Sequence, residues 1–156
     1  MLVALTISRG DVMLMSKKND AQPLYLFKAN PALAGYYPKW VDNLAEDATL
    51  EGSMLDGIVQ GDDVKKVVLA IRSLYDRQAH RFAGPYGDNN FLEDYVAEVR
   101  GKPIGCVVLV YRNASGQTQH VTASYRPRSS VVFFAKLLAE KFAGTTIAQH
   151  FAESGR

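Results

Sequence analysis

The sequence has one cysteine, three histidines and no long apolar run, and each of these shortages excludes a class of protein. A lone Cys106 allows no disulfide within the chain and no cysteine-cluster metal site. It lies in the apolar segment 104–110, which predicts a buried and unreactive thiol. His80, His120 and His150 are too widely spaced to form a local metal motif, so we expect no metal and no cofactor.

We also expect no export signal and no membrane-spanning segment. The opening segment 1–7 is apolar but short, and no positive charge precedes it, which argues against a signal peptide. The longest later apolar run, residues 106–111, has the length of a strand. We therefore expect no membrane contact and a cytosolic location, where a free thiol stays reduced. The sequence contains no P-loop, dinucleotide-binding fingerprint, internal repeat or low-complexity tract.

What the sequence does have is the composition of a folded protein. Its 156 residues are 47% hydrophobic and 22% charged, which predicts one domain over residues 1–156 with its own core. The net charge of +2 conceals a separation of signs along the chain. Seven acids and no Lys or Arg lie between Lys39 and Lys65, whereas six basic residues and no acid lie between Glu98 and Glu140. Either the two regions compensate each other within the fold, or one of them meets a charged partner.

Hydrophobic periodicity predicts an α+β fold. Alternating apolar residues around turns indicate two β-hairpins, one of residues 3–7 and 12–15 and one of residues 103–110 and 118–125, with a further strand at 23–27. A four-residue loop in the second hairpin would place Val108 opposite Val121. Apolar residues at three- and four-residue spacing predict helices over 38–48, 62–82, 91–99 and 131–142, and a short last helix that carries Ile147 and Phe151. We expect an antiparallel sheet built from the two hairpins, with the helices packed mainly on one face.

One candidate site is the basic turn that leads into the last long helix. Arg126, Arg128, Ser129 and Ser130 lie where the unpaired N–H groups of a helix start bind anions, and two guanidiniums add bidentate hydrogen bonds. His120 shares a strand face with Arg126 and is the best candidate for acid–base chemistry. The simpler interpretation is an ordinary turn with a serine N-cap.

A second candidate is an acidic, aromatic segment near the first third of the chain. Aromatic rings with polar tips beside acidic residues are typical of interface anchors, although packing in the core would also explain the rings. The predicted partner-binding residues are Tyr36, Tyr37, Trp40, Asp42, Glu46 and Asp47.

No pattern in the sequence identifies catalytic residues, and the acidic pair Glu93–Asp94 is expected on the solvent face of a short helix. The main hypothesis is a non-catalytic interaction protein that binds a basic protein partner through the acidic, aromatic surface, as a regulator, an adaptor or a toxin-neutralising immunity protein. The first alternative is an enzyme or ligand-binding domain for a small phosphorylated or carboxylated compound at the basic turn. A third hypothesis is a binder of single-stranded nucleic acid that uses Tyr111, Tyr125 and His120.

Overall fold

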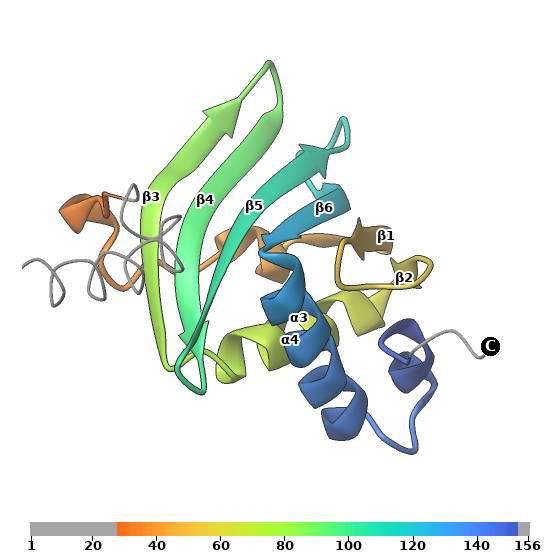
Figure 1. Ribbon diagram of the computed structural model, residues 1–156. Coiled ribbons are helices and arrows are strands. Elements are labelled where there is room, and N and C mark those ends of the chain that lie inside the picture. The colour runs from red at the N-terminus through yellow and green to blue at the C-terminus, as the bar shows by residue number, and fades with distance from the viewer. Residues whose placement is uncertain (1–27, 153–156) are drawn as a thin grey trace, which may run out of the picture.

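A six-stranded sheet forms the centre of the computed structural model, which describes residues 28–152 (Figure 1). The strand order is β2-β1-β6-β5-β4-β3. Neighbouring strands pair antiparallel, except that β1 and β6 run parallel. The strands are β1 Leu44–Gly52, β2 Val59–Gln60, β3 Arg77–Tyr86, β4 Asn90–Val99, β5 Lys102–Arg112 and β6 Thr118–Arg126.

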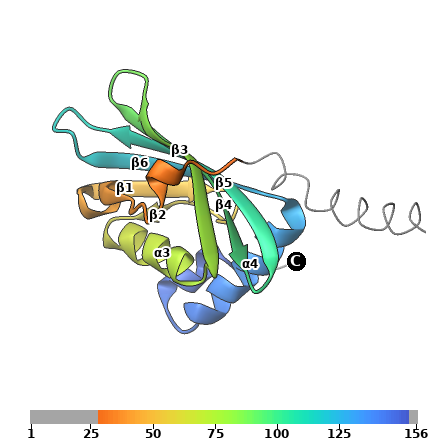
Figure 2. The same ribbon diagram turned by 90° about the vertical axis from the view of Figure 1, so that its left-hand side faces the viewer.

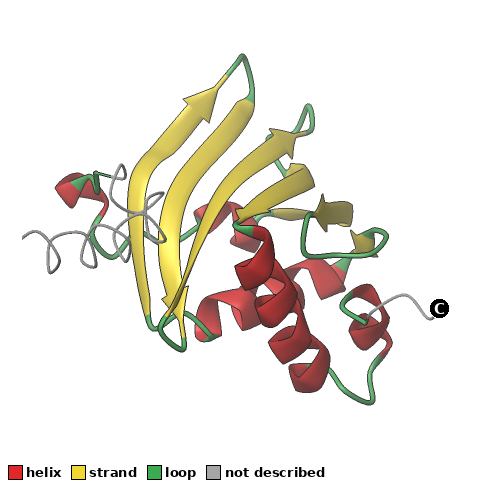
Figure 3. Cartoon of the chain, in the orientation of Figure 1, coloured by secondary structure: helices red, strands yellow, loops and turns green. Residues whose placement is uncertain are grey.

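Two α-helices, α3 (Asp62–Ser73) and α4 (Arg128–Lys141), cover the same face of the sheet. Figure 2 shows both helices on one side, and Figure 3 shows the long strands β3, β4 and β5 bending around them. Three short 3₁₀ segments complete the described chain: η1 Pro31–Leu33, η2 Lys39–Asp42 and η3 Thr146–His150. We call the helix-covered face of the sheet the inner face and the opposite face the outer face.

The core lies between the inner face and the helices. In α3, apolar residues three and four positions apart form one buried stripe, and α4 buries Phe134, Leu137 and Leu138 against the same layer. Cys106 projects into this layer, and burial raises the pKa of its thiol to about 12, as expected for an inert cysteine. The buried stripe of α3 consists of Val64, Val67, Ala70 and Ile71.

The α+β class, the packing of the helices on one face of the sheet and the second hairpin are confirmed. The register of that hairpin differs from the prediction by two residues, because Val108 lies opposite Ala123 and Val110 lies opposite Val121. The difference arises at the loop, where the pairing shifts between Tyr111 and Arg112. A shift of two keeps every side chain on its predicted face, since strand side chains alternate with a period of two.

The predicted helix over 38–48 is wrong. Only Lys39–Asp42 form a 3₁₀ turn, and β1 begins at Leu44 and pairs with β6. The register shifts between Leu44 and Thr49, so that Ala45 and Ala48 are both buried although they are three residues apart. The irregular register of β1 therefore produces a spacing of buried residues that is typical of a helix.

The predicted helices over 62–82 and 91–99 are wrong in their extent or type. Helix α3 ends at Ser73, and β3 follows, with Gly84 and Pro85 inside the strand. Pro85 is tolerated there because β3 is an edge strand of the sheet. Residues 91–99 belong to β4, which lies between β3 and β5 in the sheet. In this strand every second side chain from Glu93 onward is buried on the inner face.

The predicted N-terminal hairpin and the strand at 23–27 lie outside the described residues. The sheet is not assembled from two hairpins, since β3, β4, β5 and β6 form one continuous antiparallel run that β1 and β2 extend. Helix α4 begins at Arg128, three residues before its predicted start, and neither Ser129 nor Ser130 caps it. Instead the Ser130 hydroxyl is buried and donates to the carbonyl of Pro103 at 2.6 Å.

The close approach of β1 to β6 gives a first prediction. A Cβ added at Gly52 would overlap the carbonyl oxygen of Ala123 on the neighbouring backbone. We expect Gly52→Ala to lower the free energy of unfolding by about 2–3 kcal/mol, as overpacking against a rigid group does. The matched control is Gly84→Ala, whose Cβ would lie 3.1 Å from the exposed and movable ring of Phe82. Urea denaturation of both variants measures the difference, and equal losses would contradict the packing argument.

Candidate functional site

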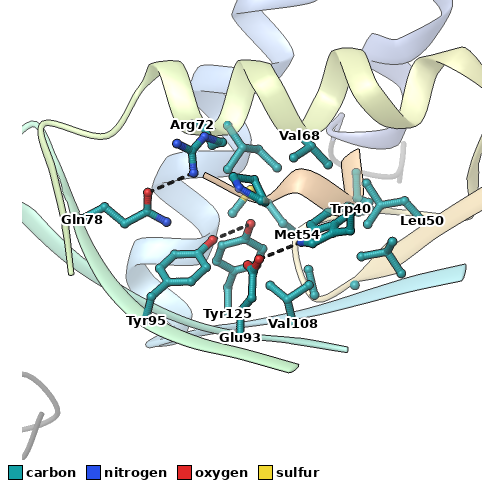
Figure 4. A pocket seen from close by; sticks show the side chains of 16 residues that line it. Trp40, Leu50, Met54, Val68, Arg72, Gln78, Glu93, Tyr95, Val108 and Tyr125 are labelled. Atoms are coloured by element: carbon teal, nitrogen blue, oxygen red, sulfur yellow. Dashed lines mark hydrogen bonds between the residues drawn. The ribbon is translucent and has the colours of Figure 1, made fainter. Parts of the chain in front are cut away.

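A narrow cavity lies between α3 and the inner face of the sheet. Its walls are mostly apolar, and the volume that the centres of water molecules can occupy is about 40 Å³. Since one water needs roughly 10–15 Å³ of such space, the cavity has room for a few waters or a small ligand. Figure 4 shows Arg72 and Gln78 at one end, Trp40 and Leu50 at the other, and Glu93, Tyr95 and Tyr125 between them.

Glu93 is the buried acid of this cavity. The alternation of β4 directs its side chain inward, where it is 3% exposed. Its Oε1 accepts hydrogen bonds from the Tyr36 hydroxyl at 2.6 Å and from the Trp40 indole N–H at 2.7 Å. Burial raises the pKa of Glu93, although the two hydrogen bonds and the charge of Arg72 lower it in part. A buried carboxyl with a raised pKa is a candidate group for accepting and returning a proton.

Three tyrosine hydroxyls form a chain beside Glu93. The hydroxyl of Tyr75 lies 2.7 Å from that of Tyr95, which lies 3.5 Å from that of Tyr125. Burial raises the pKa of all three phenols, so they remain protonated and can donate hydrogen bonds. Tyr95 and Tyr125 line the cavity, whereas Tyr75 packs against Phe134.

Among residues 28–152, Arg72 is the only cationic residue that lines the cavity. It lies in the last turn of α3, where its guanidinium donates to Oε1 of Gln78 at 3.4 Å and lies 5.3 Å from the centre of the Tyr37 ring. The long hydrogen bond leaves most of its five N–H donors without a protein acceptor among residues 28–152.

His80 lies beside the cavity in a buried, neutral state. Its ring contacts Tyr36 and Tyr95, with ring centres 4.6 and 5.0 Å away, and its Nε2 has no hydrogen-bond partner within residues 28–152. Burial lowers the pKa of His80 to about 4, and the positive charge of Arg72 adds to this shift. The imidazole therefore carries no charge at neutral pH.

The structure separates the predicted acidic, aromatic surface into two parts. The Tyr36 hydroxyl and the buried Trp40 indole both hold Glu93. The remaining residues are exposed: Tyr37 donates to Asp42, which pairs with Lys65 at 2.9 Å, and Glu46 and Asp47 lie on β1. The main hypothesis, a docking surface anchored by Trp40, is wrong because its anchor is sealed inside the protein and donates to an internal carboxylate.

The predicted anion site is not assembled as one site. The His120 ring lies 2.6 Å from the Thr49 hydroxyl and 3.2 Å from the Glu51 carboxylate. Arg126, six residues after His120 on the same strand, lies near Asp94. Six strand residues span roughly 20 Å, so His120 is far from the start of α4. Around that start, Arg128 and Ser129 are exposed and Ser130 is buried with its hydroxyl bonded to the backbone.

The residues of the nucleic-acid hypothesis lie on opposite faces of the sheet. Tyr111 and His120 pair on the outer face, whereas Tyr125 points inward and is part of the hydroxyl chain. Within residues 28–152, no group of three or more His, Cys, Asp or Glu side chains is placed to hold a metal ion. In the same range, no helix is long and apolar enough to cross a bilayer.

Glu93 is the candidate functional residue that sequence reasoning missed. Its signal is an acid at an inward position of a strand, between Phe91 and Tyr95, where an apolar residue is the norm. Assigning residues 91–99 to a helix hid that signal. The adjacent Asp94 points to the outer face, where it pairs with Arg81.

No family model matches the chain, and no curated protein matches its sequence. Solved structures do match its fold. A bacterial protein with a cystatin-like fold from Silicibacter pomeroyi DSS-3 aligns with a TM-score of 0.62 at 18% identity, over 67% of this chain and 74% of its own. A steroid delta-isomerase from Pseudomonas aeruginosa aligns with a TM-score of 0.61 at 14% identity, over 68% of this chain and 79% of its own. These likenesses establish a cystatin-like α+β fold.

The neutral His80 gives a second prediction. Because its folded pKa of about 4 lies below the usual 6.5, its stabilising effect is complete above pH 6.5 and is lost as the pH falls toward 4. Between pH 7 and pH 4.5, protonation of His80 should lower the free energy of unfolding of the wild type by about 2 kcal/mol. His80→Phe should abolish this part of the pH dependence. Urea denaturation at several pH values measures this slope. The variant and the wild type share all other titrating groups, so equal slopes would show that His80 titrates normally.

Proposed function

We propose that the protein binds a small, largely apolar molecule in the cavity beneath α3 and that Glu93 moves a proton on this molecule, as an isomerase does. The observation that carries the proposal is a buried carboxyl inside an apolar cavity, with its pKa raised by burial. Apolar walls with a few convergent polar groups are typical of small-molecule sites. An acid with a shifted pKa inside such a cavity is typical of a proton-transfer residue.

The arrangement supports a shift of a proton along a carbonyl compound. In a β,γ-unsaturated carbonyl compound, the Glu93 carboxylate removes a proton from the carbon between the carbonyl and the C=C bond, and the electron pair of that C–H bond forms a dienolate. The protonated phenols Tyr95 and Tyr125 donate hydrogen bonds to the enolate oxygen, where negative charge develops. The Glu93 carboxylic acid then returns the proton to a different carbon, so that the double bond moves and Glu93 is regenerated.

The fold likeness supports the same class of function. One of the matching structures is described as a steroid delta-isomerase, although at 14% identity its likeness concerns the fold alone. The small-ligand alternative from the sequence is therefore the better hypothesis, with its site moved from the basic turn to the cavity. The predicted cytosolic location stays part of this proposal.

Binding without turnover is the second candidate, since the apolar walls of the cavity would hold a small ligand whether or not Glu93 moves a proton on it. A ligand larger than a few heavy atoms needs side chains such as Met54 and Leu55 to move aside. Both are part of the cavity wall, and a methionine adapts easily to different shapes. The two candidates share the ligand site and differ only in what Glu93 does.

A third prediction tests the ligand site. Trp40 is the only tryptophan of the chain and it lines the cavity, so its fluorescence reports on occupancy. We expect cyclohexanone to change the Trp40 emission in a saturable way and Ala123→Phe, which fills the cavity, to abolish the response. The matched control is Ser124→Phe, which adds the same ring at the neighbouring exposed position on the outer face. A response that survives in Ala123→Phe, or no response in the wild type, would contradict the site.

A fourth prediction tests proton transfer. In D₂O, the protein should exchange the α-hydrogens of cyclohexanone for deuterium, and NMR measures the rate. Glu93→Gln should lower this rate about 100-fold or more, the usual loss on removing a general base. In the wild type the rate should rise with pH through the raised pKa of Glu93, because only the carboxylate accepts a proton.

Tyr36 provides the matched pair for this assay. Its hydrogen bond lowers the pKa of Glu93, so Tyr36→Phe should move the pH profile to higher pH. Tyr37→Phe removes a hydroxyl that contacts the exposed Asp42 and should leave the profile in place. Exchange that is unchanged in Glu93→Gln would refute catalysis by Glu93 and leave the binding function.

A further inference from the structure

The geometry points to a carboxylate on the ligand of this cavity, paired with the Arg72 guanidinium at the end that Arg72 shares with Gln78. The inference rests on the proposed function and names its ligand class: a small apolar carboxylic acid. Its carboxylate would lie at the Arg72 end, its apolar part toward Trp40 and Leu50, and Glu93 would face the carbons between them (Figure 4).

Arg72 carries a charge that the described protein does not pair. Within residues 28–152, no carboxylate lies within ion-pair distance of its guanidinium, and its hydrogen bond to Gln78 is long at 3.4 Å. An arginine that is half-buried against an apolar wall loses hydration, and unpaired charges are costly there. A ligand carboxylate offers two oxygens in the spacing that the guanidinium fork accepts.

The arginines of strand β3 show the contrast. Arg77 pairs with Glu98 and Arg81 pairs with Asp94, both on β4. Among the described residues, the only acid that lines the cavity with Arg72 is Glu93, and its Oε1 already accepts hydrogen bonds from Tyr36 and Trp40. The protein thus keeps Arg72 beside Glu93 without joining them in a salt bridge, which leaves the guanidinium free for a ligand.

The charges of the cavity favour a single negative charge on the ligand. A monoanion is compensated by the single charge of Arg72, whereas a doubly charged phosphate exceeds what one guanidinium compensates. A bound anion would also add to the effect of burial and raise the pKa of Glu93 further.

The test compares hexanoate with hexanamide, which has the same length and shape and no charge. Titrations followed by Trp40 fluorescence and by calorimetry at pH 7 give both affinities. We expect hexanoate to bind the wild type about 10- to 100-fold more tightly, the usual gain from a charge-assisted pair of hydrogen bonds. Arg72→Gln should remove this preference while hexanamide binding stays within about threefold.

Two variants complete the design. Arg72→Lys keeps the charge without the planar fork and should retain only part of the preference. Arg128→Gln removes an exposed guanidinium at the start of α4 and should retain all of it. Circular dichroism and melting temperatures establish that each variant is folded, and the ratio of the two affinities in the wild type needs no variant at all.

The outcomes separate the inference from the function on which it rests. Equal binding of hexanoate and hexanamide by the wild type would overturn the carboxylate assignment and leave the cavity as a ligand site. A preference lost in Arg128→Gln and kept in Arg72→Gln would move the anion to the basic turn. Tighter binding of hexyl phosphate than of hexanoate would overturn the choice of anion. No response of Trp40 to any of these compounds or to cyclohexanone would refute the inference and the proposed function together.

Discussion

The site depends on one contact: a buried carboxyl held by two donors from a distant segment. Burying Glu93 costs free energy that hydrogen bonds must offset, and both donors come from the chain before β1. Tyr36 and Trp40 thereby fasten the η1–η2 segment to β4, more than fifty residues away. The same contact forms a wall of the cavity, because Trp40 lines it. The packing of the η1–η2 segment and the placement of the Glu93 carboxyl thus depend on the same two hydrogen bonds.

The sequence predicted those elements whose signals are local. The second hairpin alternates cleanly around a turn, and both α3 and α4 show an apolar stripe at helical spacing. The failures occur where pairing with a distant strand overrides local pattern. In β1 an irregular register imitates a helix, and in β3 the apolar residues after Ser73 continue the spacing of α3 by chance. Only partner strands decide between these alternatives.

The site was missed for a related reason. Two neighbouring acids are equivalent in a sequence but not in a strand, where one faces inward and the next outward. Glu93 enters the cavity and Asp94 meets Arg81 on the outer face. Charge counting along the chain misjudged the aromatic segment in the same way. It placed Trp40 with its acidic neighbours, whereas the fold places it with an acid from another strand.

The electrostatics of the cavity follow from which groups are neutral. His80 is held uncharged by burial, the tyrosines are held protonated, and burial raises the pKa of Glu93. Among the described residues that line the cavity, Arg72 is the only cation. A single cation at one end of an apolar cavity would attract the charged end of an anionic ligand. The groups around Glu93 therefore shift the proton affinity of its carboxyl, and the charge of Arg72 would determine which end of the proposed ligand faces the helix.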